Sequence, residues 1–209
     1  MFENGLQYVR SDFHLHTNKD KEFTYTGEPN SFVNDYVSAL KEANISVGVI
    51  TNHNKFDINE YKAIRKAAKK QDIFILPGVE LTVKEGANGI HTLIVFNPDE
   101  WLEGGNNHIQ TFLTAAFATV HNPENRNTKS VYDLKNVFEK LDAYGRDYFI
   151  IFAHVGVDYL NLWQDLLPLK TVFLVCKNPE LVIISINLKN VAVICPLSSR
   201  VLILKPLQI

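Results

Sequence analysis

Short apolar segments with a histidine or glutamate at or near their carboxyl end recur along the chain, and this repetition constrains its fold most strongly. In the first segment, residues 12–17, His14 and His16 are two positions apart. Side chains at i and i+2 of a strand point to the same face, so the two imidazoles should project together. The later segments bring His53, Glu80, His91 and His154. These endings predict that separate strands deliver ligands to one polynuclear metal site.

Amphipathic segments alternate with the apolar ones. Strands are expected at 7–16, 46–51, 73–76, 90–96 and 148–152, from their apolar and β-branched residues. Helices are expected from the N-cap Ser31 to about 43, after the N-cap Asp57, at 107–120 and at 130–143. This alternation predicts an α/β protein with parallel βαβ units in a barrel or a doubly wound sheet. Functional residues in such folds lie at the carboxyl ends of the strands.

The composition sets wider limits on the class of protein. A chain of 209 residues with 46% hydrophobic and 21% charged residues suits one sizeable globular domain. Its net charge of -2 gives no electrostatic footprint for nucleic acid or an anionic membrane. The first residues lack the features of a signal peptide, and no apolar run reaches about 18 residues. With Cys176 and Cys195 outside any CxxC pair, two reduced thiols in a cytoplasmic protein are expected, and a disulfide between them is the alternative.

The last part of the chain differs from the rest. Residues 165–209 are rich in leucine, isoleucine and valine, and no glycine follows Gly156. Short strands are expected there, separated by pairs such as Asn178-Pro179 and Cys195-Pro196. The segment either completes the core or results from truncation or a change of reading frame. We therefore divide the chain into a metal-binding domain, 1–164, and an atypical apolar segment, 165–209.

The residue types at the strand ends favour metal-assisted hydrolysis. Imidazole and carboxylate ligands suit zinc, manganese or iron. Two such ions about 3.5 to 4 Å apart polarise a phosphoryl oxygen and lower the pKa of bound water. Glu80 is a natural bridge, because each of its oxygens can hold one ion. No P-loop, Rossmann fingerprint or serine or cysteine nucleophile motif competes with this interpretation. Taken singly, Glu80 also fits a turn carboxylate and His91 a core histidine.

As an ordered set, the motifs at 12–17, 50–54, 77–81, 91 and 153–154 resemble those of the PHP family, the polymerase and histidinol phosphatase domain. The resemblance covers about residues 8–156. It implies a distorted (β/α)7-type barrel, incomplete at its carboxyl terminus, with two or three divalent ions (Mn, Zn or Fe) for phosphoester hydrolysis. The aromatic-rich N-terminus and residues 25–27 also resemble the PHP module that precedes an ATPase domain in longer bacterial proteins.

The resemblance also implies a role for each matching residue. His14 and His16 would bind one ion, Glu80 would bridge, and the other ions would be bound by His53, His91 and His154. Asp12 would accept a hydrogen bond that orients a histidine. Asp20 is the nearest acidic candidate in the loop after the first motif. The residues assigned to catalysis are Glu80, Asp12 and Asn52.

Two departures from the family pattern leave the function open between three hypotheses. Asn52 stands where the family has aspartate, and no Asp-x-His follows His154. The leading hypothesis is a metal-dependent phosphoesterase that acts on a small-molecule or nucleotide phosphoester through metal-activated water. The second is a degenerate, non-catalytic PHP module with a regulatory or interaction role. The third is an amidohydrolase-like metal hydrolase.

Overall fold

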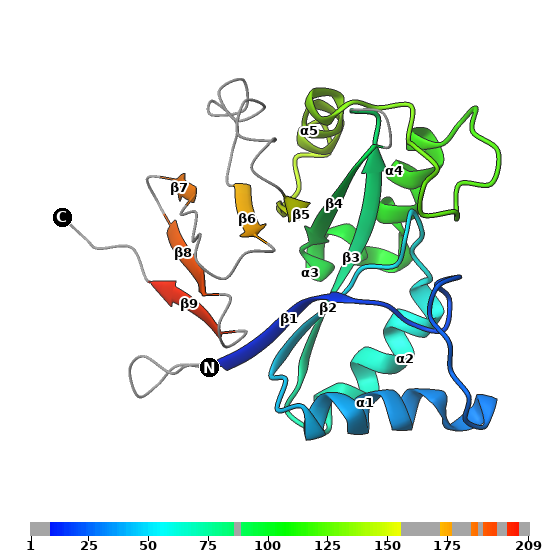
Figure 1. Cartoon of the computed structure of the whole chain (residues 1–209), viewed down its shortest axis with the longest axis vertical. Helices are drawn as coiled ribbons and strands as arrows, with labels where there is room; N and C mark the ends of the chain where they lie inside the picture. Colours follow the sequence, from blue (N-terminus) through cyan, green and yellow to red (C-terminus); the bar gives the residue numbers. More distant parts are fainter. Residues whose placement is uncertain are drawn as a thin grey trace.

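A single nine-stranded sheet runs through the structure, a computed structural model (Figure 1). The structure describes residues 9–85, 89–155, 172–176, 185–187, 190–195 and 200–204, and side chains within 9–85 and 89–151. The strand order is β6-β5-β4-β3-β2-β1-β9-β8-β7. The strands are β1 Val9–Leu15, β2 Val47–Ile50, β3 Phe74–Val83, β4 Ile90–Phe96, β5 Tyr148–Val155, β6 Val172–Cys176, β7 Ser185–Asn187, β8 Asn190–Cys195 and β9 Arg200–Leu204.

The first three strands form the parallel βαβ units that the sequence predicts. β1 pairs in parallel with β2, and β2 with β3. The crossovers carry α1, Phe32–Glu42, and α2, Ile58–Lys69, which lie together below these strands in Figure 1. Parallel pairing places the ends of β1 and β2 at one edge of the sheet. This part of the fold therefore brings the first two motifs together.

Two antiparallel pairs that begin at β3 interrupt the parallel pattern. The strand expected to end at residue 76 continues through Pro77 and Gly78 to Val83, because β4 pairs with it from Gly78 onwards in an antiparallel hairpin. β5 is also antiparallel to β4. The prediction of parallel units throughout was therefore wrong for the β3-β4 and β4-β5 pairs, whereas β5 and β6 pair in parallel. The described pairings form one open series from β6 to β7, so a seven-stranded barrel is not confirmed.

The helices differ from their expected bounds at the ends. Ser31 occupies the N-cap position of α1, but its side chain makes no capping hydrogen bond. A 3-10 turn, Pro29–Ser31, leads into the helix instead. Asp57 caps α2 as predicted, accepting hydrogen bonds from the backbone of Asn59 and Glu60. The remaining helices are α3 Pro98–Trp101, α4 His108–Ala116 and α5 Leu134–Asp142, the last two shorter than expected.

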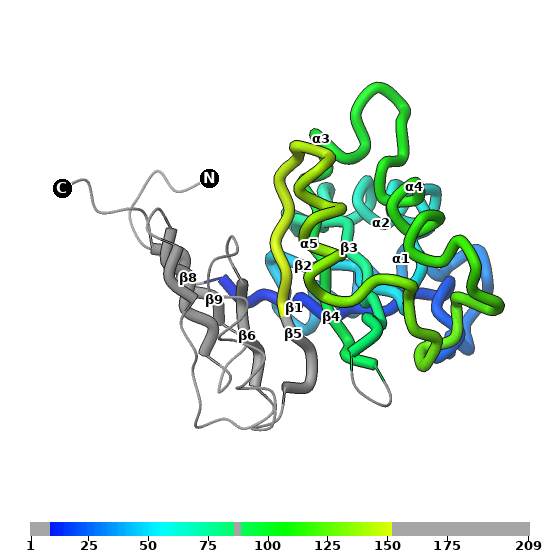
Figure 2. The backbone as a smooth tube through the Cα atoms, turned by 90° about the horizontal axis from the view of Figure 1, so that it is seen from above, coloured from blue at the N-terminus to red at the C-terminus, as the bar shows by residue number. Residues whose placement is uncertain are grey.

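The sheet has a helix-covered face and an opposite face, and β3 shows both. Ile75, Val79, Leu81 and Val83 belong to the large core that includes α1, α2, α4 and α5. The alternate residues of β3 point the other way, where Leu76 packs on a second cluster of Val49, Leu93, Val95 and Ile151. Figure 2 shows α1, α2 and α4 on the same side of the strands. Glu80 therefore lies on the face away from the helices. Among the described residues, no helix is both long enough and apolar enough to cross a membrane.

Gly78 permits the close approach of β3 to its neighbours. A Cβ atom added there would lie 2.7 Å from Val49 Cγ1 and 2.9 Å from the Ile94 carbonyl oxygen. We expect Gly78→Ala to lower the free energy of unfolding by about 1–3 kcal/mol, since the carbonyl belongs to a paired strand that cannot move alone. Gly48→Ala is the control, because its Cβ would meet the flexible ends of Leu15 and Ile75. Denaturant unfolding of the two variants checks this, and an equal loss in both would contradict it.

Candidate metal centre

Main-chain pairing brings the second and third motifs together. After β2 the chain continues beside β3, where His53 and Glu80 form an isolated parallel bridge. The Glu80 N–H donates to the Asn52 carbonyl (3.1 Å), and the Asn54 N–H donates to the Glu80 carbonyl (2.8 Å). His14 lies in β1, next to β2, and His16 follows one residue past the end of β1. Their positions are thus fixed by the backbone of the sheet.

Four imidazoles surround the buried carboxylate of Glu80, which is 1% exposed. Its Oε2 lies 2.6 Å from His14 Nε2, 3.2 Å from His53 Nε2 and 3.5 Å from His16 Nε2. Its Oε1 lies 2.6 Å from His91 Nδ1. His91 reaches it across the hairpin, because Glu80 is opposite Leu93 and His91 is two residues away on the same face. Glu80 is therefore the centre of the cluster.

Asp20 is a second buried carboxylate in the cluster, and it was left out of the predicted ligand set. Its Oδ2 lies 3.0 Å from His16 Nδ1 and 2.9 Å from His53 Nδ1, and it accepts the His53 N–H at 2.7 Å. Its Oδ1 accepts the Glu22 N–H. The available signal was its position four residues after His16. What the sequence did not show is the turn from Thr17 to Asp20 that folds the loop back over the site.

The surroundings keep both carboxylates ionised. Burial alone would raise the pKa of Glu80, but its hydrogen bonds with His14 and His91 outweigh burial and hold the pKa far below its usual value. Burial likewise opposes the effect of His16 and His53 on Asp20, whose pKa is also strongly lowered. For His53, burial lowers the pKa, yet the hydrogen bond with Asp20 and the nearby charges raise it overall. The centre thus holds two anionic groups ready to bind cations.

Asn52 and Asp12, both assigned to catalysis, lie behind the cluster. The Asn52 amide oxygen accepts the Thr17 N–H, and its nitrogen donates to Thr17 Oγ1, both at 2.8 Å. Thr17 Oγ1 in turn donates to Glu60. Asp12 accepts the backbone N–H of His14 at 2.9 Å. Asn52 holds the start of the loop that carries Asp20, and Asp12 holds the main chain of His14.

The donor set fits divalent ions. Three groups of side chains offer ligand atoms within 4.8 Å of one another: His14, His16 and Glu80; His16, Asp20 and His53; His53, Glu80 and His91. A tetrahedral ion with bonds of about 2.0–2.2 Å separates its ligand atoms by about 3.3–3.6 Å. The spacings of 2.6–3.5 Å around Glu80 require only small outward shifts. Neighbouring groups share a residue, which is the arrangement that adjacent ions require.

The side chain of His154, the remaining predicted ligand, lies outside the described residues. Its backbone belongs to β5, where Phe152 pairs with Thr92, one residue from His91. The His154 backbone therefore lies in the strand next to β4, which carries His91. A metal-binding role for His154 stays a prediction.

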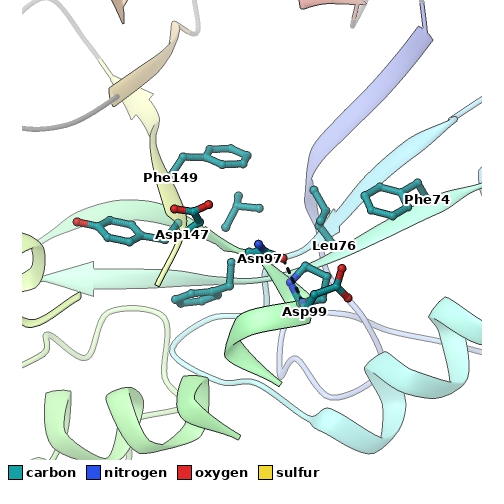
Figure 3. A pocket seen from close by; sticks show the side chains of 10 residues that line it. Phe74, Leu76, Asn97, Asp99, Asp147 and Phe149 are labelled. Carbon is teal, nitrogen blue, oxygen red and sulfur yellow. Dashed lines mark hydrogen bonds between the residues drawn. The ribbon is translucent and has the colours of Figure 1, made fainter. Parts of the chain in front are cut away.

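The cluster opens into a cavity of about 410 Å³. Besides His14, His16, His53, Glu80 and His91, it is lined by Glu22 and Arg126, which sequence reasoning did not identify. A second pocket of about 270 Å³ lies where β3 begins and β4 ends (Figure 3). Phe74, Leu76, Asn97, Asp99 and Phe149 are among the residues that line it, with the Asp99 N–H donating to the Asn97 side chain. No histidine lines this second pocket, so the candidate metal ligands gather in the first.

Comparisons with known proteins give structural likeness alone. No protein-family model matches the chain, and no curated protein matches it. An amidohydrolase from Chromobacterium violaceum, solved with sulfate and no metal, has a TM-score of 0.45 at 17% identity, over 75% of this chain and 73% of its own. A protein from Bifidobacterium adolescentis, assigned as a metal-dependent phosphoesterase, has a TM-score of 0.44 at 12% identity, over 77% and 76%.

A third similar structure is a two-domain protein from Bacteroides vulgatus with a predicted PHP-like metal-dependent phosphoesterase domain. It has a TM-score of 0.43 at 15% identity, over 77% of this chain and 42% of its own. The similar structures thus include PHP-like phosphoesterases and an amidohydrolase. At these TM-scores the likeness carries no argument about function, which must come from the cluster itself.

Removing either buried carboxylate should reduce the number of bound ions. We expect protein purified and saturated with Mn²⁺ or Zn²⁺ to hold at least two equivalents, and Glu80→Gln and Asp20→Asn to lose one or more. Because ions that bind only the native state stabilise it, chelator should lower the thermal midpoint of the wild type. Elemental analysis and thermal unfolding measure both effects, with the exposed Glu42→Gln as control. Wild-type protein that binds no ion after reconstitution would refute the assignment.

Stability of the metal-free protein should depend on pH in two opposite ways. The pKa values of Glu80 and Asp20 are lowered by folding, so their stabilisation is present above about pH 4 and declines as pH falls below it. The pKa of His53 is raised, so its contribution is complete below about pH 6.5 and is lost as pH rises through the folded value. Denaturant titrations from pH 3 to 9 should show two limbs in the free energy of unfolding, a loss of stability at acid pH and another loss as the pH rises. Glu80→Gln should flatten the acid limb, whereas Glu42→Gln should leave it intact.

Proposed function

We propose that this chain is a metal-dependent phosphoesterase of the PHP type, which hydrolyses a phosphoester with water. The observation that supports it is the Glu80 carboxylate within 2.6–3.5 Å of four imidazoles, joined through His16 and His53 to a second carboxylate, Asp20. Such a mixed nitrogen and oxygen set suits two or three ions of manganese, zinc or iron. Ions held there would stabilise negative charge on a phosphoryl group and lower the pKa of water.

The buried residues and the partly exposed residues of the site have different roles. Glu80 and Asp20 are buried and anionic, which balances the charge of the ions without contact with bulk water. The side chains of His14, His16 and His91 are 27%, 24% and 22% exposed and line the cavity, where a substrate would meet them. A cavity of about 410 Å³ is within the usual size range for small ligands. It suits a small-molecule or nucleotide phosphoester.

The hydrogen bonds of Asn52 remove one argument for the non-catalytic alternative. Thr17 Oγ1 gives its only proton to Glu60, so it can only accept a hydrogen bond from residue 52. The asparagine nitrogen supplies that hydrogen bond, and an ionised aspartate has no proton to give. Asparagine at this position is therefore matched to its neighbours and is not by itself a sign of a decayed site. We assign Asn52 and Asp12 a positioning role, and Glu80 the bridging one.

Phosphatase activity should depend on metal and on His16. We expect the reconstituted wild type to hydrolyse a generic phosphoester such as p-nitrophenyl phosphate, and His16→Ala to reduce turnover by about 100-fold or more. The exposed His121→Ala is the matched control, since His121 does not line the cavity. Turnover measurements with Mn²⁺, Zn²⁺ and Fe²⁺ on phosphoester and amide substrates distinguish the three hypotheses. Activity on amides alone would favour the amidohydrolase-like alternative, and no gain from any metal would reject catalysis.

A further inference from the structure

Arg126 lies on the wall of the metal-site cavity. Arg126 lines the same cavity as His14, His16, His53 and His91. Among the described residues that line this cavity, it alone carries a permanent positive charge. Sites for anionic substrates place such a group beside the reacting centre. Arg126 is therefore a candidate for substrate recognition.

The main chain of Arg126 is fastened to the strand that carries Glu80. Thr82 Oγ1 donates to the Arg126 carbonyl at 2.6 Å, and the Ser130 N–H donates to the Thr82 carbonyl at 2.8 Å. The buried Asn54 side chain donates to the carbonyls of Asn125 and Thr128, at 3.2 and 3.0 Å. The loop is thus attached two residues after Glu80 and one residue after His53. These attachments fix the position of Arg126 relative to the metal ligands.

The side chain of Arg126 is held by Glu22. Its Nη1 donates to Glu22 Oε2 at 2.9 Å, and the Glu22 N–H donates to Asp20 at 2.9 Å. The two side chains are 52% and 42% exposed. An ion pair this exposed contributes little to stability, so another anion can replace Glu22 at small cost. Glu22 therefore keeps the guanidinium at the cavity and leaves it available.

We propose that Arg126 binds the phosphate group of the substrate, that Glu22 is its counter-ion when no substrate is bound, and that this exchange selects phosphate monoesters. This proposal rests on the proposed function. A guanidinium matches the spacing of two phosphate oxygens in a bidentate hydrogen bond. A monoester has three unesterified oxygens and a charge near -2 at neutral pH. It can therefore bind ions and still offer oxygens to Arg126.

The counter-ion makes the selection sharper. Glu22 carries one negative charge, as does a phosphodiester or a carboxylate. A singly charged ligand therefore gains little Coulomb energy by taking its place beside Arg126. A doubly charged monoester gains more, because the interaction energy scales with the product of the charges. Arg126 and Glu22 together act as a filter for ligand charge.

Binding of inorganic phosphate tests the contact separately from catalysis. We expect calorimetry on the metal-reconstituted protein to show phosphate bound about 10- to 100-fold more weakly by Arg126→Ala, because this variant lacks the charge-assisted contact with phosphate. Arg126→Lys should fall between Arg126→Ala and the wild type, and Glu22→Gln should bind phosphate more tightly. Metal content should be unchanged in all three. Arg146→Ala is the control, because Arg146 pairs with Glu103 and does not line the cavity.

Turnover of two related substrates tests the selectivity. For Arg126→Ala, kcat/KM should fall about 10- to 100-fold on p-nitrophenyl phosphate and less than about 3-fold on bis(p-nitrophenyl) phosphate. For Glu22→Gln, the ratio of kcat/KM on the monoester to kcat/KM on the diester should be smaller than for the wild type. Equal losses on both substrates, or phosphate binding that is unaffected by Arg126→Ala, would overturn the proposal while leaving a phosphoesterase. Arg126-dependent phosphate binding without turnover of either substrate would support the contact and reject the proposed function instead.

Discussion

The buried carboxylate of Glu80 is the interaction on which the site depends. A charge that is 1% exposed is strongly disfavoured unless it is paired and hydrogen-bonded. Here His14, His53 and His91 supply the pairing, and each comes from a different part of the sheet. The charge therefore ties β1, the end of β2 and β4 to β3 through one carboxylate. The same electrostatic demand that holds these strands in place creates the binding site for cations.

The parts of the site that follow strand geometry could be predicted from the sequence, and the parts carried by loops could not. His14 and His16 are two positions apart, so they point to the same side of a strand. His53 and Glu80 each follow an apolar run, so the local sequence places each of them at the end of a strand. Asp20 and Arg126 reach the site through turns and through hydrogen bonds from Asn54 and Thr82, which join residues far apart in the chain. The antiparallel hairpin was missed because Pro77 and Gly78 are typical of a strand end, yet here they lie inside a long strand.

The hydrogen bonds that link Asn52, Thr17 and Glu60 show how the single proton of a hydroxyl group can restrict the type of a neighbouring residue. Each hydroxyl has a single proton, and Thr17 directs it to Glu60. The direction of the hydrogen bonds then requires a donor at residue 52. The amide of Asn52 meets this requirement, because it donates to Thr17 Oγ1 and accepts from the Thr17 N–H.

The alternation of β3 has a consequence for the tolerance of the chain to insertions. One side of this strand supplies apolar residues to the helix-covered core, and the other supplies the central carboxylate. A residue deleted from β3 before Glu80 would bring Leu81 to the imidazoles and move the Glu80 carboxylate to the place of Val79 in the apolar core. Both faults would appear at once and neither could be repaired by repacking. The turns that flank β3 should therefore accept changes of length, and the strand itself should not.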